Sequence, residues 1–344
     1  MPRTALLGHW VRELFEPDFP DRDFRLEPAS ADASFRRYFR LTLPDGTTRI
    51  VMDAPPDKEE CRPFLKVAAL FREAGVHVPV VLAENLEQGF LLLSDLGNTT
   101  YLTALKDRNL APQLYGDANS ALLALQIASR PGVLPEYDYA LLSRELALFP
   151  DWYLAHHLGL TPDKATQDTL HRVFSEILTN NLKQPQVFVH RDYHSRNLMV
   201  IGDNAPTFPT NPGILDFQDA VYGPISYDLV SLYRDAYIQW SEEQELDYVI
   251  RYWEAARRAS LPVHADFHDF YRDYEWMGAQ RQLKVLGIFA RLCHRDGKDD
   301  YLKDMPRVLS YLRRTCQRYA ELRPLARLLD GLDEQRQVEV GYTF

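Results

Sequence analysis

Three side chains in the middle of the chain have the types and the spacing needed to move a phosphoryl group. His190 opens the pattern H-R-D-x-x-x-x-N, whose acid is Asp192 and whose amide is Asn197. In such a loop the Asp takes the proton of an attacking hydroxyl, and the Asn holds Mg²⁺. A later apolar run ends in Asp216. Because Mg²⁺ is a hard cation that prefers oxygen ligands, the Asp216 carboxylate is a second candidate ligand. We therefore predict Asp192 as the catalytic base and Asn197 and Asp216 as ligands of Mg²⁺.

These residues need short strands to bring them together. Residues 186–189 form a β-type run that delivers the catalytic loop, and residues 198–201 with 213–215 are typical of a hairpin. Such a hairpin returns Asp216 beside Asn197, so that two oxygen ligands meet at one cation.

The bulk composition is that of a globular protein with more than one lobe. A length of 344 residues exceeds one ordinary core, and 46% hydrophobic with 26% charged residues excludes a disordered chain. The net charge of −10, without Lys/Arg clusters, argues against a nucleic-acid partner. No run of about 18 apolar residues occurs, so no membrane partner is expected. Three widely spaced cysteines indicate free thiols in a reducing compartment, so we expect a cytoplasmic protein. We also expect the protein to be a monomer.

The first 97 residues combine strands with one helix after an opening helix. A strand is predicted wherever a β-type run ends at a turn signal, and helices are predicted from three- and four-residue apolar steps. The opening helix is expected over 6–15, strands over 24–28, 35–43 and 49–53, a helix over 57–74, and a hairpin from 76–82 and 90–93. This order is typical of the amino-terminal lobe of a kinase.

Two stretches of this lobe are candidate nucleotide contacts. The run 29–34 consists of small and turn-forming residues between two strands, where a phosphate-covering loop would lie, although a plain strand connector has the same composition. Small side chains let backbone amides approach a phosphate. The short polar linker 94–97 would act as a hinge whose backbone faces the adenine. The predicted nucleotide contacts are Ser30, Ser34, Arg37, Ser94, Asp95 and Leu96.

Helical patterns dominate from residue 98 to residue 344. They are expected over 100–108, 112–129, 143–158, 161–180, 227–239, 241–259, 266–295 and 305–322, followed by a charged, mobile tail over 330–344. The predicted fold class is therefore α+β, with a small antiparallel-sheet lobe (1–97) and a larger, mainly helical lobe (98–344).

The sequence resembles the aminoglycoside phosphotransferase and choline kinase branch of protein-kinase-like enzymes. The shared motif is H-x-D-x-x-x-x-N, here His190, Asp192 and Asn197, followed by a metal-binding Asp, here Asp216. That family also begins a helix with a phrase ending in D-L, here at Asp228. The resemblance implies that Asp228 braces the catalytic loop by hydrogen bonding and that His190 supports the loop from inside.

Four phrases resemble, more narrowly, bacterial kinases that phosphorylate the anomeric (C1) hydroxyl of N-acetylmuramate and N-acetylglucosamine during peptidoglycan recycling. These phrases are residues 32–40, 50–56, 89–97 and 281–292. The resemblance implies ATP as the phosphoryl donor, an N-acetylated amino sugar as the acceptor, and Mg²⁺ as the cofactor.

Four residues are candidate sugar contacts, and two of them have a plainer alternative. Asp53 ends the third strand and is otherwise a turn carboxylate. His194 lies in the catalytic loop and is otherwise an exposed loop histidine. Arg281 and Arg291 lie on a late helix, where an Arg could meet the lactyl carboxylate of muramate.

One departure from the kinase pattern concerns the phosphates. Protein kinases carry a Lys on the third strand for the α- and β-phosphates, but Met52 occupies that place here. Arg37, Arg40 and Arg49 are candidate replacements, because an Arg can bind phosphate bidentately.

Two rival functions remain open at this stage. One is a kinase of another small hydroxyl compound, such as an aminoglycoside, choline or homoserine. The other is a nucleotide-binding pseudokinase scaffold, which the missing Lys favours and the intact base and metal ligands disfavour.

Overall fold

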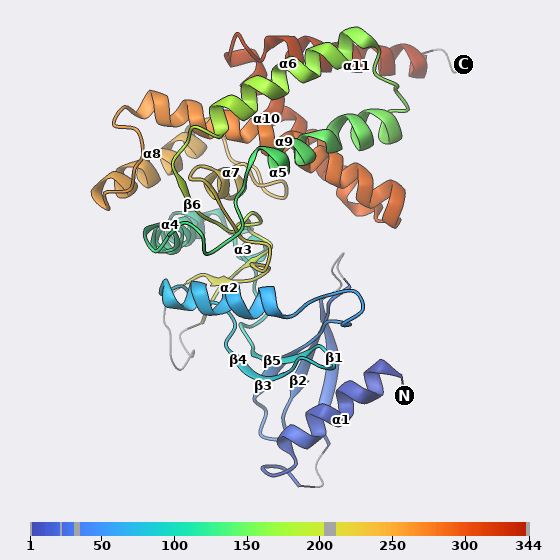
Figure 1. The fold of residues 1–344 in the computed structure, drawn as a ribbon, viewed down its shortest axis with the longest axis vertical. Helices are drawn as coiled ribbons and strands as arrows, with labels where there is room; N and C mark the ends of the chain where they lie inside the picture. The colour runs from blue at the N-terminus through green and yellow to red at the C-terminus, as the bar shows by residue number, and fades with distance from the viewer. Residues whose placement is uncertain (1, 21–22, 31–34, 203–210, 342–344) are drawn as a thin grey trace. The chain divides into compact units, whose positions relative to one another are not determined.

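The computed structural model describes residues 2–20, 23–30, 35–202 and 211–341 (Figure 1). The chain divides into two compact units. Unit 1 comprises residues 1–104 and 198–219, and unit 2 comprises residues 105–197 and 220–344. The lobes predicted from the sequence, 1–97 and 98–344, stay a prediction.

Unit 1 is built on a five-stranded antiparallel sheet with the strand order β1-β2-β3-β5-β4. The edge strand over residues 81–85 alternates half-buried and exposed positions, whereas the strand beside it, over residues 90–94, is buried at four of its five positions. The five strands are β1 (Arg25–Ser30), β2 (Arg37–Thr42), β3 (Thr48–Asp53), β4 (Val81–Asn85) and β5 (Phe90–Ser94).

Helix α1 (Arg3–Phe15) packs against this sheet (Figure 1). It buries Leu7, Trp10 and Val11 in one cluster with sheet residues that include Leu41 and Phe90. The three-residue and four-residue spacing of these side chains puts them on one face of the helix, so apolar burial fixes α1 on the sheet.

Two boundaries in unit 1 were predicted wrongly. Helix α2 (Arg62–Glu73) begins five residues later than the predicted 57–74, with a proline in its first turn, where a missing N–H costs nothing. Strand β4 begins at Val81 and not at residue 76, because Pro79 has no N–H to give to a ladder. The small-residue run also starts inside β1 at residues 29–30, and residues 31–34 lie outside the described residues.

A second hairpin of unit 1 follows the catalytic loop, as predicted. Strand β7 (Leu198–Met199) pairs antiparallel with β8 (Gly213–Ile214). The hairpin is tied to the rest of unit 1 by the Ile214 N–H, which donates to the His77 carbonyl at 2.7 Å, and the Val200 N–H, which donates to the Thr99 carbonyl at 2.8 Å. The chain must therefore return to unit 1 to complete it.

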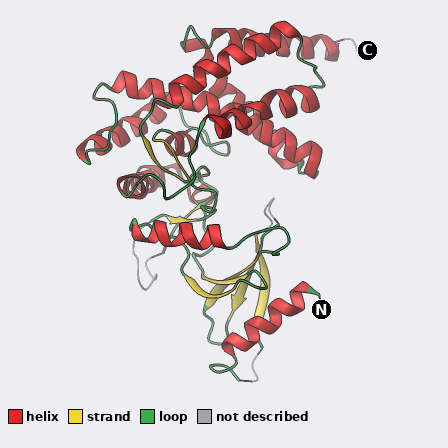
Figure 2. Ribbon diagram, in the orientation of Figure 1, coloured by secondary structure: helices red, strands yellow, loops and turns green. Residues whose placement is uncertain are grey.

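Unit 2 is mostly helical, whereas the sheet belongs to unit 1 (Figure 2). Its regular helices are α4 (Ala111–Ile127), α5 (Tyr139–Leu148), α6 (Lys164–Asn181), α7 (Tyr227–Tyr233), α8 (Glu242–Arg258), α9 (Phe267–Asp296), α10 (Met305–Arg318) and α11 (Arg323–Gly341). Strands β6 (Gln186–Val189) and β9 (Val221–Pro224) pair antiparallel beside them. The predicted α+β class, with an antiparallel sheet first and helices after it, is confirmed.

Four helix predictions need correction. The helix expected over 143–158 begins at residue 139 and becomes the π-helix η2 (Phe149–His157), which starts where Pro150 removes a donor. The stretch 100–108 holds only α3 (Tyr101–Ala104), followed by the short 3₁₀ turn η1 (Arg108–Leu110). The helix expected over 227–239 ends at Tyr233. Helix α11 extends through most of the region predicted to be a mobile tail, 330–344.

Helix α9 is the element on which unit 2 is assembled. It packs against α5, α6, α7, α10 and η2, and most of its residues are buried. Among the helices in the described ranges, none has the length and the apolar run that crossing a membrane would require.

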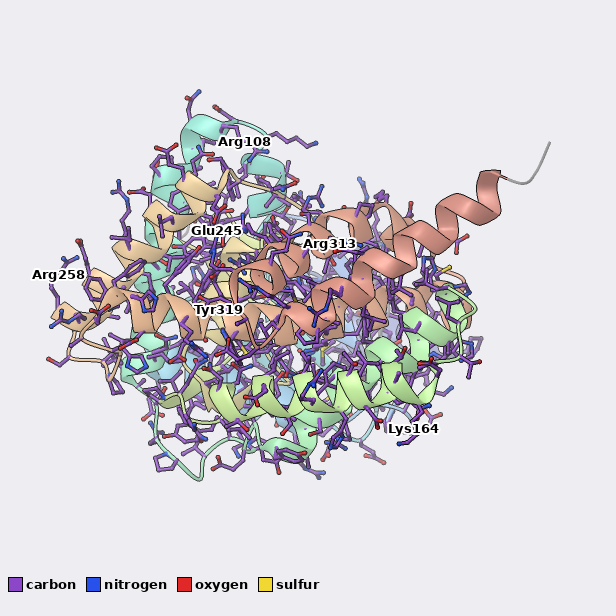
Figure 3. All side chains as sticks on the ribbon, turned by 90° about the horizontal axis from the view of Figure 1, so that it is seen from above. Arg108, Lys164, Glu245, Arg258, Arg313 and Tyr319 are labelled. Atoms are coloured by element: carbon purple, nitrogen blue, oxygen red, sulfur yellow. The ribbon has the colours of Figure 1, made fainter. Side chains whose placement is uncertain are left out.

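A buried ionic cluster joins three helices of unit 2, and we call it the Arg234 cluster. The fully buried guanidinium of Arg234 donates to Glu245 of α8 at 2.6 Å and to Glu275 of α9 at 2.8 Å. Arg314 and Arg318 of α10 pair with the same two carboxylates. Glu245 lies inside the unit, whereas Lys164 and Arg258 lie at its rim (Figure 3).

We predict that Gly287→Ala lowers the free energy of unfolding by about 2 kcal/mol or more. A Cβ at Gly287 would lie 2.4 Å from the backbone carbonyl oxygen of Leu148, so α9 must move away from α5. The matched control is Gly116→Ala in α4, where a Cβ has open space and helix propensity should add up to about 1 kcal/mol. Urea unfolding of the two variants measures both effects, and equal effects would contradict the close approach.

Candidate active site

The catalytic loop leaves β6 and folds back on itself inside unit 2. The Asp192 N–H donates to Nδ1 of the buried His190 at 3.2 Å, and the Asn197 side-chain amide donates to the Asp192 carbonyl at 3.0 Å. The structure therefore brings the predicted base, its supporting His and the predicted metal-binding Asn together in one loop.

Asp228, at the start of α7, accepts hydrogen bonds from this loop. Its carboxylate receives the His190 N–H at 2.6 Å and the Arg191 N–H at 3.0 Å. Arg191 has a φ of 78°, which costs a non-glycine residue free energy, so the surrounding contacts must hold it there. This geometry is what the bracing role predicted for Asp228 requires.

A second carboxylate that holds the loop was missed from the sequence. Asp235 accepts the Ser195 N–H at 2.9 Å and the Tyr237 N–H at 2.8 Å. It follows Asp228 by seven residues and lies beyond the end of α7 at Tyr233, so helical periodicity gave no signal for it. The structure places one buried carboxylate at each end of the loop.

Glu145 and Lys284 were also missed, and they surround the base with charge. The Lys284 ammonium contacts Glu145 at 3.0 Å and the Tyr227 hydroxyl at 2.9 Å, and Arg191 pairs with the same glutamate. The Tyr137 hydroxyl donates to the other oxygen of Glu145. One buried carboxylate from α5 therefore fixes both the Lys of α9 and the Arg that precedes the base.

These cations keep Asp192 ionised. Burial raises the pKa of Asp192, but the positive charges of Lys284, Arg281 and Arg191, together with the nearby His194, outweigh burial and bring this pKa down to about 2. Asp192 is therefore ionised at neutral pH, as a side chain that accepts a proton must be.

We predict that Asp228 makes the stability of the protein depend on pH. Burial raises the pKa of Asp228 to about 7, against the two N–H donors, whereas an unfolded Asp titrates near about 4. Between about pH 4 and pH 7 the folded chain therefore holds a proton on Asp228 that the unfolded chain has lost. Its stabilising effect is complete below about pH 4 and is lost as pH rises to about 7.

Urea unfolding at pH 4, 5.5 and 7 measures this effect against Asp228→Asn, which cannot titrate. The free energy of unfolding of the unsubstituted protein should fall, relative to the variant, by on the order of 2 kcal/mol across the range. Parallel pH curves would contradict the raised pKa.

The predicted sugar contacts of unit 2 lie in two places. His194 and Arg281 both lie close enough to Asp192 to influence its pKa. The pKa of His194 is lowered by burial, so its ring is neutral near pH 7, and it packs edge-on against Tyr237. Arg291 lies ten residues after Arg281, about 15 Å along α9, beside Arg295 and Asp296. Its predicted role stays a prediction.

The charged side chains of unit 1 that were predicted to contact nucleotide or sugar already have partners within that unit. Asp53 is fully buried on β3 and accepts from Arg3 at 2.5 Å and from Arg37 at 3.1 Å. Arg40 binds Asp95 through two hydrogen bonds, of 2.6 and 2.9 Å. These pairs neutralise charge within unit 1, and the nucleotide and sugar contacts predicted here stay predictions.

The linker 94–97 was predicted to contact the nucleotide through its backbone. Its side chains make contacts that fix the conformation of the linker itself. Ser94 Oγ accepts from the Val80 N–H at 2.8 Å. A Leu96 methyl lies where a Cβ on Gly213 would stand, so the linker packs on β8. The backbone of Ser30 ends β1, and Ser34 lies outside the described residues.

The missing third-strand Lys has a candidate substitute that sequence reasoning did not find. Met52 is fully buried, as an apolar residue at its place in β3 should be. Arg36, just before β2, pairs with Glu59 at 2.9 Å, and both side chains are largely buried. This ion pair resembles in kind the Lys–Glu pair of protein kinases.

Asp216 is held by its neighbours in unit 1. It adopts a left-handed φ of 61°, and its carboxylate accepts from the Gln218 amide at 2.8 Å. The Phe217 ring packs 4.8 Å from Phe64 and 5.9 Å from Phe71, both on α2. Helix α2 therefore fixes the backbone that presents the predicted metal ligand. Within the described ranges no group of three or more His, Cys, Asp or Glu side chains could hold a metal ion.

Comparison with known proteins agrees with this geometry. The model of the phosphotransferase enzyme family matches residues 25–263. An N-acetylmuramate/N-acetylglucosamine kinase of Neisseria meningitidis serogroup B is 50% identical over 347 residues, covering 100% of both chains. A kinase of the same name from Pseudomonas aeruginosa is 52% identical over 309 residues, covering 90% of this chain and 89% of its own.

Solved structures show the same fold at low identity. An ethanolamine kinase of Plasmodium vivax superposes with a TM-score of 0.62 at 12% identity, covering 90% of this chain and 87% of its own. The family match and the full-length identity settle the classification. The chain belongs to the phosphotransferase enzyme family.

Proposed function

We propose that this protein transfers the γ-phosphoryl group of ATP to the anomeric (C1) hydroxyl of N-acetylmuramate and N-acetylglucosamine. The observation that carries the proposal is the 50% identity over the whole chain with a kinase named for these two sugars. The role in recycling cell-wall sugars and the cytoplasmic location are part of the same proposal.

The chemistry assigned to unit 2 is proton removal from the acceptor. Asp192, ionised at neutral pH, takes the proton as the C1 oxygen bonds to the γ-phosphorus and the bond from that phosphorus to the ADP oxygen breaks. A hemiacetal hydroxyl is more acidic than an alcohol, so a weakly basic carboxylate suffices. Asp228 and Asp235 hold the loop backbone at both ends, which keeps the base in place.

The metal part of the proposal rests on the sequence motif. Asn197 and Asp216 are the proposed ligands of Mg²⁺, which would neutralise phosphate charge during transfer. The ion pair of Arg36 and Glu59 is the group we propose in place of the third-strand Lys.

Two alternatives are separated by one assay. An ADP-release assay with Mg-ATP compares N-acetylmuramate, N-acetylglucosamine and kanamycin, and the product is tested for an acid-labile 1-phosphate. Turnover on the N-acetylated sugars supports the proposal. Turnover on kanamycin alone would indicate an aminoglycoside kinase, and ATP binding without turnover on any acceptor would indicate a scaffold.

A further inference from the structure

Arg281 lies on the face of α9 that is turned to the catalytic loop. It precedes Lys284 by three residues, and side chains three apart share a helix face. Lys284 reaches Tyr227 and Glu145, and the charges of Lys284 and Arg281 both act on Asp192. Arg281 therefore belongs to the surroundings of the base.

The guanidinium of Arg281 acts through its charge on Asp192 and Asp228, but within the described residues it makes no direct ion pair with either carboxylate. The residue is 5% exposed, and its Nε is buried without a hydrogen-bond partner. Within the described part of the chain, no hydrogen bond or ion pair engages its side chain. The buried Arg234, by contrast, has two carboxylates. Since a buried Arg is normally paired, this cation indicates a place for an anion.

Two neighbouring groups of the loop are also unsatisfied. His194 Nδ1 and Ser195 Oγ are buried and have no hydrogen-bond partner within the described residues. Buried polar atoms of native proteins are nearly always bonded, so unbonded ones next to a base call for a ligand. A cation with two neutral polar groups suits a ligand that carries one negative charge and several hydroxyl or amide groups.

The position favours the acceptor over the nucleotide as the source of this anion. Arg281 and Asp192 both belong to unit 2, and Asp192 is the group that meets the acceptor hydroxyl. Of the two acceptors of the proposed function, on which this step rests, N-acetylmuramate carries a lactyl carboxylate and N-acetylglucosamine carries none. Arg binds a carboxylate through two parallel N–H bonds. We infer that Arg281 binds the carboxylate of the sugar-acid acceptor and determines its preference over the neutral sugar.

The test is steady-state kinetics of the full chain with three acceptors, N-acetylmuramate, its methyl ester and N-acetylglucosamine. With Arg281→Gln, kcat/KM for N-acetylmuramate should fall about 30-fold or more, mainly through KM, because a desolvated charge pair is lost. The value for N-acetylglucosamine should fall about ten-fold less than that for N-acetylmuramate, because the loss of positive charge near Asp192 affects both sugars whereas the lost carboxylate contact affects only the acid. The variant should no longer distinguish acid from ester.

The matched control is Arg295→Gln, which removes an exposed guanidinium from the same helix. It should leave kcat/KM unchanged for both sugars. Activity on N-acetylglucosamine reports that the variant is folded. If no Arg281 variant folds, the unsubstituted protein still decides, because it should use the ester about 30-fold less well than the acid.

Three outcomes would overturn the inference. Equal loss of kcat on both sugars would place Arg281 at the phosphoryl group, and equal use of acid and ester by the unsubstituted protein would remove the carboxylate contact. Turnover of N-acetylglucosamine but not of N-acetylmuramate would contradict this inference and would still support the proposed kinase activity. Turnover of neither sugar would overturn the proposed function as well.

Discussion

Asp192→Asn should lower kcat for both sugars between about a hundred-fold and ten-thousand-fold, the range that a positioned general base contributes. The amide cannot take the proton, yet its size and its place after Arg191 are unchanged. The Asp192 N–H that donates to His190 Nδ1 and the Asp192 carbonyl that accepts from the Asn197 amide are backbone groups, which the substitution leaves in place. The loss should therefore appear in turnover and not in folding.

Three measurements separate this result from simple damage. The unfolding midpoint and the ATP affinity of Asp192→Asn should match those of the unsubstituted protein. Asp168→Asn, on the exposed surface of α6, is the matched control and should keep full activity. Turnover of Asp192→Asn within about three-fold of normal would show that another group removes the proton.

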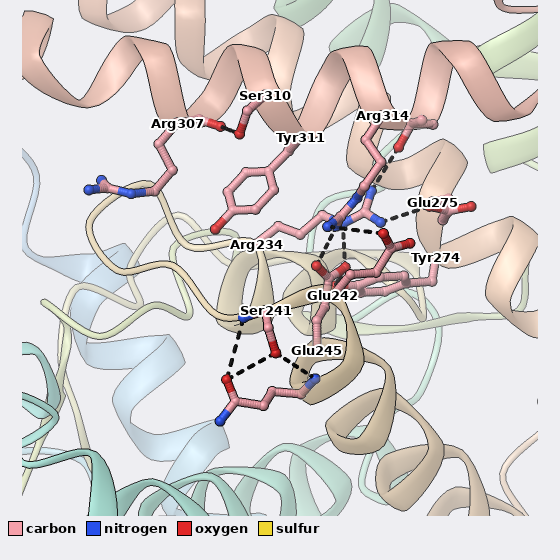
Figure 4. Close-up of polar contacts among 12 residues, drawn as sticks. Arg234, Ser241, Glu242, Glu245, Tyr274, Glu275, Arg307, Ser310, Tyr311 and Arg314 are labelled. Atoms are coloured by element: carbon pink, nitrogen blue, oxygen red, sulfur yellow. Dashed lines mark hydrogen bonds and ion pairs between the residues drawn. The ribbon is translucent and has the colours of Figure 1, made fainter.

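Arg234→Met should lower the free energy of unfolding by about 3 kcal/mol or more. The substitution leaves Glu245 and Glu275 buried with one cation fewer, while the volume of the side chain is roughly kept (Figure 4). Arg314 and Arg318 still pair with the two carboxylates, which keeps the loss below that of two bare charges.

Urea unfolding measures this loss of stability, and two further variants serve as controls. Arg251→Met breaks an exposed pair with Asp247 and should change stability by less than about 1 kcal/mol. Replacing Arg234, Glu245 and Glu275 together by apolar residues should recover part of the loss, because no fully buried charge of the cluster then remains, and Arg314 and Arg318 keep Glu242 as a partner. A single Arg234→Met variant as stable as the unsubstituted protein would show that water enters the cluster.

The part of the site that the sequence predicts is the part that is local in the chain. Asp192 and Asn197 are five residues apart, so one loop conformation brings them together and a motif can describe it. Glu145 and Lys284 come from helices 139 residues apart and share no motif. Only the packing of α9 on α5 brings them to the base, and a single sequence holds no signal for that packing.

The same reasoning separates the correct from the wrong elements of the fold. The hairpin of β7 and β8 was predicted because β-type runs and a turn signal are short-range features. The start of α2 was missed because residues 57–61 are mostly charged and hold no apolar step that would locate a helix start. The end of α7 was missed because apolar residues continue past Tyr233. The π-helix after Leu148 depends on Pro150 and on the approach of α9 at Gly287, which apolar periodicity does not reveal.

The discontinuous course of unit 1 has a consequence for how the protein is made. Ribosomes release the sheet early, but β8 and its bond to His77 emerge only after the stretch 105–197 has been synthesised. The nascent unit 1 must therefore wait without its second hairpin, although its five-stranded sheet is complete, while more than ninety residues of the other unit leave the exit tunnel. A fragment that stops at residue 104 would lack this hairpin, so the gene cannot be cut there to yield a complete first unit.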